Sequence, residues 1–264
     1  MKHLQVEILS QRPVAEGYYE LKMSWPTEAT PPLPGQFFTA RIGSGSVPLL
    51  RRPFAFSSFK MSENGDCSTA CIYQKRGTAT RELAGMTPGE QLDILAPLGN
   101  TFPLSESAFS GRLVIIAGGV GVGPMIYTAE YVRARNPLLV VGARNKSLLP
   151  LDCLPDDIET LLCTDDGSHG TKGTVIDALS DYDGDNYGAV LACGPNPMLS
   201  AAHHWAKEQQ IECYVSMEQT MGCAVGACMG CVIPVEGPQP YARVCMEGPV
   251  FASDMVKWKE LSNV

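Results

Sequence analysis

Short apolar runs alternate with Pro- and Gly-rich turns through the first part of the chain, and no long stretch there has the apolar spacing of a helix. Runs of β-forming residues bounded by turn signals predict strands at Gln5–Leu9, Tyr18–Met23, Phe37–Arg41, Ala70–Gln74 and Gln91–Leu95. Regularly spaced short strands favour a small antiparallel barrel over residues 1–102. A β-sandwich is the alternative that this pattern leaves open.

The pattern changes near Phe102. Leu113–Ala117 (LVIIA) is a continuous apolar run, as a buried parallel strand requires. Similar runs predict strands at Leu138–Gly142, Thr160–Cys163 and Ala189–Cys193. The spacing between them predicts helices at about Pro124–Arg135, Thr174–Ser180 and Pro197–Gln209. Alternating strands and helices indicate a doubly wound α/β domain over residues 103–214.

The character changes again from Ser216, where cysteine, glycine and alanine crowd together before a short Pro/Gly-rich stretch. We interpret residues 215–264 as a small module that holds a cofactor. The predicted fold class is therefore multidomain α+β: an antiparallel β-barrel, a doubly wound α/β domain and a small C-terminal module.

Composition narrows the possible functions. A net charge of -8 disfavours nucleic acid and anionic membranes as partners, because the average field of the chain repels both. No stretch is apolar for long enough to span a bilayer, and Met1–Ser10 lacks the apolar core of a signal peptide. We therefore expect a cytoplasmic protein. In that reducing compartment, its ten cysteines suggest a metal or cluster more than disulfides.

The strongest chemical signal is the spacing Cys223-x4-Cys228-x2-Cys231, with Cys245 further along. It matches the plant-type ferredoxin pattern, in which four thiolates hold a [2Fe–2S] cluster. Small residues between these cysteines leave the backbone free to wrap a cluster and to aim N–H groups at its sulfurs. They are Gly222, Ala224, Gly226, Ala227 and Gly230. A four-cysteine zinc site and unrelated thiols are the alternatives, although structural zinc usually shows two separated pairs.

Two glycine-containing turns follow predicted buried strands. Gly119, Gly121 and Gly123 lie in a GGVGVGP turn that opens a helix, a context that supports dinucleotide binding because glycine allows close approach to a pyrophosphate. Their spacing differs from the GxGxxG fingerprint, so a tight structural turn remains the alternative. Cys193 and Gly194 begin a CGPNPM turn at the carboxyl edge of the sheet, where the thiol is either a nicotinamide contact or a plain strand end.

The predicted barrel carries two candidate phosphate-binding elements. Arg52, in the segment RRPFAFS, has a guanidinium group suited to clamping an anion, although most arginines are ordinary surface charges. Gly77 and Thr78 open the turn GTAT before a helical segment at Thr80–Ala84. That turn offers N–H and hydroxyl donors to a phosphate.

Taken in order, these motifs resemble the ferredoxin reductase-like family. Within it, MEQTMGCAVGACMGC, RVCMEGPVF, PLLRRPFAFS and TDDGSHGTKG are similar to the electron-transfer subunits of class 1B, NAD-dependent dihydroorotate dehydrogenases. The resemblance spans nearly the whole chain, and the cysteine segment and RVCMEGPVF are its most specific parts. It implies an FAD-binding barrel, an NAD-binding α/β domain and a [2Fe–2S] module.

The resemblance carries over residue by residue. Arg52, Pro53, Phe54 and Ala55 match the flavin motif of the family, except that Ala55 stands where a Ser hydroxyl usually approaches the flavin. Ser57 is a possible substitute. Gly77 and Thr78 carry over as pyrophosphate contacts. The adjoining strand is implied to reach the flavin through its backbone at Ala70, Cys71 and Ile72.

The implied activity is electron transfer. A partner subunit that contains FMN oxidises dihydroorotate, and electrons cross the [2Fe–2S] cluster and the FAD of this chain to NAD+, with two copies of each chain in the complex. No catalytic acid, base or nucleophile is expected on this chain. No basic cluster suits a 2′-phosphate, which favours NAD over NADP, although Arg144 and Lys146 leave NADP open as the alternative. The alternatives are a reductase subunit of another complex, of hydrogenase or ferredoxin–NADP type, and a non-enzymatic zinc module.

Overall fold

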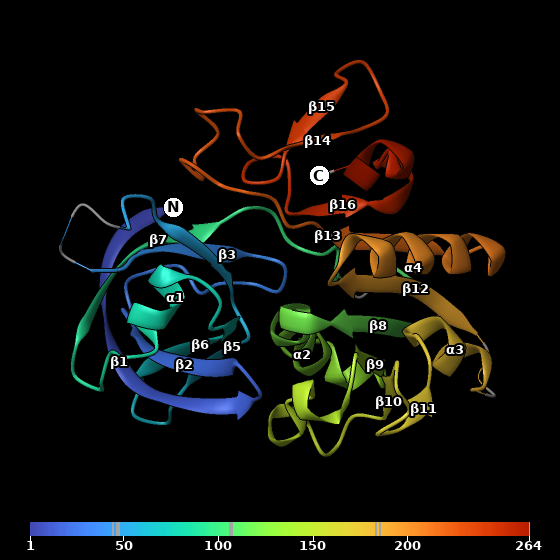
Figure 1. Cartoon of the computed structure of the whole chain (residues 1–264), viewed down its shortest axis with the longest axis horizontal. Coiled ribbons are helices and arrows are strands. Elements are labelled where there is room, and N and C mark those ends of the chain that lie inside the picture. The colour runs from blue at the N-terminus through green and yellow to red at the C-terminus, as the bar shows by residue number, and fades with distance from the viewer. Residues whose placement is uncertain (44, 46–47, 106–107, 183, 185, 264) are drawn as a thin grey trace.

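The computed structural model describes residues 1–43, 45, 48–105, 108–182, 184 and 186–263. Within these residues, the strands form two seven-stranded sheets and one two-stranded hairpin (Figure 1). None of the helices in this described part of the chain is both long and apolar enough to cross a membrane.

The first sheet is built from the N-terminal strands, whose order is β4-β3-β7-β1-β2-β6-β5. They are β1 (Lys2–Ala15), β2 (Tyr18–Trp25), β3 (Phe37–Arg41), β4 (Arg52–Ala55), β5 (Ser58–Met61), β6 (Cys67–Gln74) and β7 (Gln91–Leu98). All neighbours pair antiparallel. The two edge strands, β4 and β5, are separated in the chain only by Phe56 and Ser57, so the sheet must curl back on itself. The predicted barrel is confirmed, and the sandwich alternative is wrong.

An apolar core fills the barrel. Within it, the ring centroid of Phe38 lies 5.5 Å from that of Phe54 and 5.1 Å from that of Phe56. Helix α1 (Thr78–Leu83) buries Ala79 and Leu83 against the same core. Burial of each large side chain contributes about 2 kcal/mol to folding. The sequence pattern missed β4 and β5, which are only four residues long.

The second sheet has the order β11-β10-β9-β8-β12-β13-β16, with every pair parallel except the last. Its strands are β8 (Arg112–Gly118), β9 (Leu138–Ala143), β10 (Thr160–Thr164), β11 (Thr171–Lys172), β12 (Tyr187–Cys193), β13 (Glu212–Ser216) and β16 (Val250–Ala252). The helices between them are α2 (Val122–Tyr131), α3 (Val175–Ser180) and α4 (Asn196–Glu208). The predicted α/β domain is confirmed. The predicted helix Pro124–Arg135 is shorter, because its last part is the 3-10 turn η2 (Arg133–Arg135).

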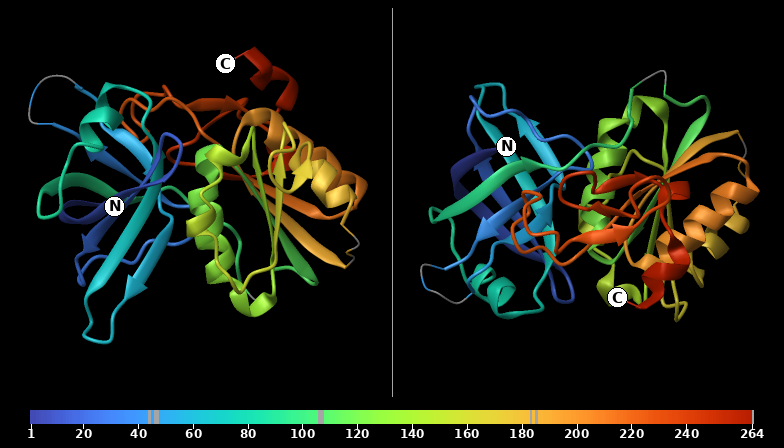
Figure 2. Two further views of the ribbon diagram at one scale, coloured as in Figure 1. Left: turned by 60° about the horizontal axis from the view of Figure 1, so that its bottom comes forward. Right: turned by 90° about the horizontal axis from the view of Figure 1, so that it is seen from above.

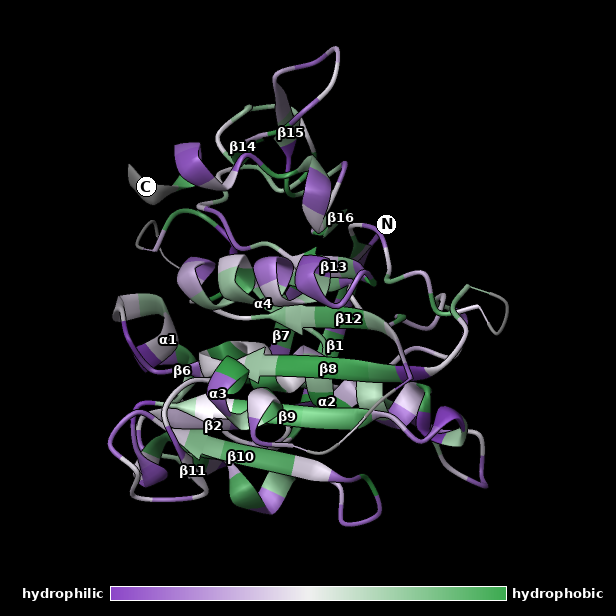
Figure 3. Cartoon of the chain, turned by 90° about the vertical axis from the view of Figure 1, so that its right-hand side faces the viewer, coloured by the Kyte–Doolittle hydropathy of each residue, from purple (hydrophilic) through white to green (hydrophobic). Residues whose placement is uncertain are grey.

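Both faces of this sheet are covered, and Figure 3 shows the resulting apolar strands β8 and β9. Val114 and Ile116 of β8 pack with α3 and α4, whereas Leu113 and Ile115 pack with α2 on the opposite face. The strand order reverses between β8 and β12. Their carboxyl ends therefore flank the topological switch point, where ligands of open α/β sheets bind.

The C-terminal segment lies over both sheets (Figures 1 and 2). It contains the hairpin of β14 (Val232–Pro234) and β15 (Tyr241–Arg243), and then β16, which joins the second sheet beside β13. Cys231, Val244 and Cys245 share one apolar cluster with residues of that sheet. Short 3-10 turns complete the fold: η1 (Gly119–Gly121), η3 (Lys146–Leu148), η4 (Leu151–Cys153), η5 (Ser253–Met255) and η6 (Trp258–Asn263). The division of the chain at 102 and 214 stays a prediction.

Candidate cofactor-binding site

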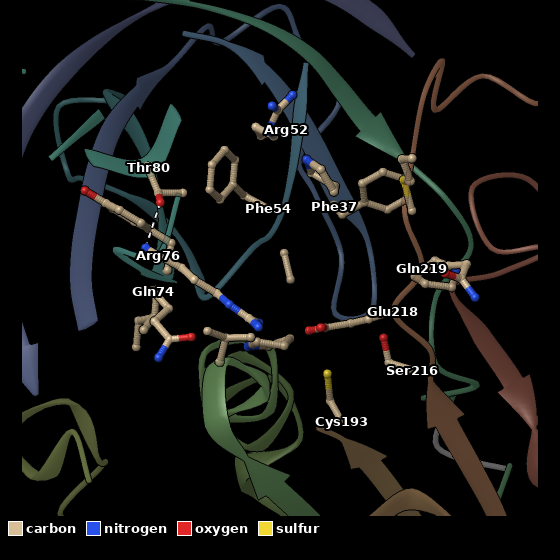
Figure 4. Close-up of a pocket in the computed structure, with 18 of the residues that line it drawn as sticks. Phe37, Arg52, Phe54, Gln74, Arg76, Thr80, Cys193, Ser216, Glu218 and Gln219 are labelled. Atoms are coloured by element: carbon tan, nitrogen blue, oxygen red, sulfur yellow. Dashed lines mark hydrogen bonds between the residues drawn. The ribbon is translucent and has the colours of Figure 1, made fainter. Parts of the chain in front are cut away.

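A cavity of about 810 Å³ opens between the barrel, helix α2 and the beginning of the C-terminal segment. Figure 4 shows side chains from all three parts directed toward it. Its lining residues are Gly35, Phe37, Arg52, Pro53, Phe54, Ala55, Ile72, Tyr73, Gln74, Arg76, Gly77, Thr78, Ala79, Thr80, Val120, Pro124, Cys193, Ser216, Met217, Glu218, Gln219, Met221 and Pro249. A pocket of this size is in the range that suits an organic cofactor.

The cavity brings together predicted contact residues from four separate segments of the chain. Eight of the predicted contacts line it: Arg52, Pro53, Phe54, Ala55, Ile72, Gly77, Thr78 and Cys193. Six others do not: Ala70, Cys71, Gly119, Gly121, Gly123 and Gly194. Segments more than a hundred residues apart in sequence thus form one site, which fits an extended ligand with chemically different ends.

Two of the six residues outside the lining belong to strand β6. Cys71 is fully buried in the barrel core, and Ala70 accepts a hydrogen bond from the N–H of Ser57 through its carbonyl, at 2.8 Å. Ser57 is itself buried and does not line the cavity, whereas Ala55 does. Substitution of Ser57 for the hydroxyl that Ala55 lacks stays a prediction.

The glycines of the two turns allow the parts of the site to approach closely. A Cβ on Gly121 would lie 2.2 Å from the carbonyl oxygen of Cys193, and one on Gly194 would lie 2.6 Å from Met198. A Cβ on Gly123 would press on Ile72 and Ser57 of the barrel at 3.2 and 3.3 Å. These contacts indicate that the glycines of both turns are needed for close packing.

Gly119 has a different reason to be glycine, since its φ of +57° lies in the left-handed region. Val120 and Pro124, from the same turn, line the cavity. The turn therefore reaches the site, even though its three predicted glycines do not line it.

One wall of the cavity carries groups suited to phosphate. Arg52 lies on β4, and the backbone of Gly77 is open, since nothing lies within 4 Å of the position of an added Cβ. The hydroxyl of Thr80 accepts hydrogen bonds from the N–H groups of Arg76 and Gly77, at 2.9 and 3.0 Å, and so orders the turn. The side chain of Arg76 extends into the cavity (Figure 4), and the sequence analysis missed it.

The other end of the cavity holds Cys193, Ser216 and Glu218. Burial raises the pKa of the Cys193 thiol, which is therefore neutral at physiological pH. Glu218 is exposed by surface area, but its carboxyl group extends into the cavity (Figure 4), where partial loss of solvent raises its pKa. Titratable groups with shifted pKa values gather at functional sites, and the sequence analysis missed Glu218 because only the fold brings its segment to the cavity.

The four predicted ligand cysteines lie beyond Met221, in the C-terminal segment. The N–H groups of Val225 and Cys228 point at Cys223 and lower its pKa to about 6; the distance from Cys228 N to Cys223 Sγ is 3.3 Å. Gly230 N lies 3.4 Å from Cys228 Sγ. Backbone N–H groups directed at sulfur favour thiolate, the form that binds metal.

The other two cysteines are buried and interact with each other. Burial, followed by the hydrogen bond with Cys231, raises the pKa of Cys245 to about 12. Chemically this donor set fits an iron–sulfur cluster. Among the residues described, no group of three or more His, Cys, Asp or Glu side chains is already arranged to hold a metal ion. Ligation by all four cysteines therefore stays a prediction.

Comparison with known families matches residues 218–257 to the model described as the iron-sulfur cluster binding domain of dihydroorotate dehydrogenase B. Relatives described as the electron transfer subunit of dihydroorotate dehydrogenase B (NAD(+)) are similar over nearly their whole length. The protein of Geobacillus sp. (strain WCH70) is 35% identical, with 97% of this chain and 99% of that one aligned. That of Geobacillus thermodenitrificans (strain NG80-2) is 36% identical, with 96% and 97% aligned.

Two solved structures are similar to this chain in fold. A chain from the NADH-dependent reduced ferredoxin-NADP oxidoreductase superimposes with a TM-score of 0.83 and 27% identity, covering 97% of this chain and 91% of that one. Phthalate dioxygenase reductase superimposes with a TM-score of 0.62 and 16% identity, covering 89% and 87%. The second likeness shows a shared fold.

The raised pKa of Glu218 predicts how pH affects stability. A carboxyl group whose pKa is higher in the folded than in the unfolded chain costs stability as the pH rises through that folded pKa. In flavin-free protein, Glu218→Gln should therefore melt at a higher temperature than the wild type at about pH 7, and at nearly the same temperature at about pH 4. The measurement is thermal melting at both pH values, with exposed Glu208→Gln as the control. Equal melting temperatures at neutral pH would contradict the prediction.

Proposed function

Since the chain belongs to the family of electron transfer subunits of NAD-dependent dihydroorotate dehydrogenase B, we propose that it passes electrons from a dihydroorotate-oxidising partner subunit to NAD+. Its cofactors in this role are a [2Fe–2S] cluster and FAD. One observation carries the proposal: a single cavity joins the flavin-motif residues to Cys193 at the switch point and, through Met221, to the cysteine segment.

When bound, the cluster exchanges single electrons and the flavin exchanges one or two, which links a one-electron carrier to a nicotinamide that accepts only hydride. The task of the protein is to bind these groups in line. The four thiols of the cysteine segment are chemically suited to iron. The iron–sulfur description of the matching family model favours iron over zinc there.

Flavin binding is assigned to the barrel. Arg52, Pro53, Phe54 and Ala55 form one edge of the cavity, and Gly77 and Thr78 form another. The two edges together offer a guanidinium group and backbone donors, which suits the pyrophosphate of FAD and is more than the single phosphate of FMN needs. Ala70, Cys71 and Ile72 of β6 are proposed to reach the flavin through backbone groups, most directly at Ile72, which lines the cavity and lies beyond the residues of β6 that pair with β5.

Nicotinamide binding is assigned to the switch point. Cys193 and Gly194 end β12, and Gly119, Gly121 and Gly123 follow β8 beside them. Cys193 lines the cavity, so a ring placed against it would face the flavin motif across the same space. We propose NAD as the nucleotide.

The partner is proposed to be an FMN-containing catalytic subunit, present with this chain as two copies of each, in the cytoplasm. The cysteine segment is the proposed docking face. Met229, beside Cys228, has 54% of its surface exposed, as an apolar contact residue in a free subunit should. Met221 and Val225, on either side of Cys223, are half-buried, and Met221 packs against the core.

The cysteine assignment is tested by Cys228→Ser. Because serine is a poor ligand for iron, this variant should lose most of its iron and the paramagnetic signal of the reduced protein. Cys153→Ser is the matched control, since that half-buried thiol lies in η4, outside the segment. The measurements are iron analysis and electron paramagnetic resonance. Full iron content in Cys228→Ser would show that Cys228 is not a cluster ligand.

The flavin assignment is tested by Arg52→Ala. Loss of a charge-assisted contact to phosphate should weaken flavin binding by about tenfold to a hundredfold while the chain stays folded. The neighbouring Arg51 is the control, because it bonds to Asp93 at 2.7 Å and does not line the cavity. Flavin content and the identity of the released flavin are measured. Release of FMN from the wild type, or equal flavin loss in Arg51→Ala, would show the assignment to be wrong.

The division of labour between subunits is the central test of the function. This chain alone should oxidise NADH with artificial acceptors but should not oxidise dihydroorotate, and addition of the catalytic partner should create NADH production from dihydroorotate. Each chain and the mixture are assayed separately. Substantial dihydroorotate oxidation by this chain alone would refute the proposal. A tightly bound but inactive mixture would point to a different partner.

A further inference from the structure

Residues 247–250 form a junction between the parts of the fold. The segment follows Cys245 closely, and Pro249 lines the cavity. The carbonyl of Pro249 accepts a hydrogen bond from Met217 N at 2.8 Å, and Val250 opens strand β16 of the second sheet. The position of this segment therefore affects both the cavity and the cysteine loop.

Asn100 ties the barrel to this junction. It follows β7, and its backbone N–H donates to the carbonyl of Gly248 at 2.7 Å. Its side-chain Nδ2 donates to the carbonyls of Glu247 and Val250, at 2.9 and 2.8 Å, and Oδ1 accepts from Val250 N at 2.9 Å. Both amide hydrogens and the amide oxygen are thus used, a combination that only an amide side chain offers.

The preceding residue allows the close approach on which these bonds depend. A Cβ on Gly99 would lie 2.4 Å from Pro249 Cδ and 3.0 Å from the carbonyl oxygen of Gly248. The φ of Gly99 is +74°, which also favours glycine. The end of the barrel strand is therefore pressed directly onto the junction, with no side chain between them.

The junction is connected in turn to the cysteine loop. Arg243 Nη1 donates to the carbonyl of Gly226 at 2.8 Å, and Gly226 lies between Cys223 and Cys228. Arg243 also pairs with Glu247, whose carboxylate accepts from Arg243 N at 2.7 Å and from Nε at 3.0 Å. Hydrogen bonds and a short stretch of backbone therefore run from the barrel through Asn100, Glu247 and Arg243 to that loop.

We propose that Asn100 is a positioning residue for electron transfer: it holds the cysteine loop at a fixed place relative to the flavin cavity and so sets the rate of transfer between the two sites. The inference rests on the proposed function. Asn100 lines neither the cavity nor the cysteine loop, so it acts through the junction. A purely structural role would change stability, whereas this role changes one step of the reaction.

The test is Asn100→Ala in the cofactor-loaded protein. Iron content, flavin content and the rate of flavin reduction by NADH should match the wild type. Reduction of the cluster after rapid mixing with NADH should be about tenfold slower, because loss of precise placement slows a reaction between held groups. A second readout is independent of activity: backbone amides of residues 241–252 should exchange hydrogen for deuterium faster than in the wild type.

Gln36→Ala is the matched control. Its amide bonds to the carbonyl of Gly99 at 3.1 Å and to Leu33 N at 3.0 Å, and it makes no bond to the junction. Asn100→Asp is the second variant, because it keeps the oxygen that accepts from Val250 but loses both donated bonds. Because its second carboxylate oxygen faces the carbonyl oxygens of Glu247 and Val250, it should slow cluster reduction at least as much as Asn100→Ala, and it supplies the test if Asn100→Ala does not fold.

Wild-type cluster reduction in both Asn100 variants, or equal slowing in Gln36→Ala, would overturn the inference. Failure of the proposed function has a different signature, namely a wild-type chain without iron and flavin or without NADH-driven cluster reduction. In that case the exchange measurement on residues 241–252 still decides whether Asn100 holds the junction.

Discussion

Helix α2 is buried on both sides, and the site takes its shape from that constraint. All residues from Val122 to Ala129 are buried, although a helix on the surface of an α/β domain normally keeps a polar outer face. One side packs on the second sheet, while Tyr127 reaches the barrel cluster and donates a hydrogen bond to the carbonyl of Pro32 at 2.7 Å. Helix α2 therefore joins the barrel to the sheet, and the cavity lies beside this contact.

Close packing at the turns follows from the same constraint. Gly123 admits Ile72 and Ser57 of the barrel to the beginning of α2, and Gly121 admits the strand end at Cys193. Any larger side chain at either place would separate parts that must meet at one cavity. The same principle recurs at Gly99, where the barrel meets the junction at Pro249. At these contacts glycine serves mainly to let two backbones approach closely, and its backbone flexibility matters less.

The sequence predicted the strands well where the pattern was strong. The uninterrupted run at Leu113–Ala117 is the core of β8, and the alternation from Tyr18 is β2. Strands β4 and β5 escaped detection because each has only four residues, too few for a clear alternation, and depends on pairing with β3 and β6. Helix α2 was predicted as too long because the good helix formers Arg133, Ala134 and Arg135 continue past its end, where they form a 3-10 turn instead.

For the site, local motifs predicted the right regions but not every contact. Arg52 and Gly77 line the cavity because the short segments around them form its edge.

The alternating glycines of the GGVGVGP turn illustrate why sequence could not finish the assignment. Close approach of backbone to a ligand and close approach of backbone to another strand demand the same residue, and only the fold distinguishes them. Glu218 and Arg76 were missed for a related reason: each is an ordinary charged residue in sequence, and becomes a site residue only because its segment borders the cavity.

The arrangement also shows how one chain can bring the segments assigned to different electron carriers close together. The barrel, the switch point and the cysteine segment each contribute part of a continuous path, in which Met221 borders the cavity and Cys223 follows two residues later. The work left to the protein is the placement of bound groups, and placement depends on contacts between parts. Residues at those contacts, such as Asn100 and Arg243, therefore matter to function as much as residues that touch a ligand.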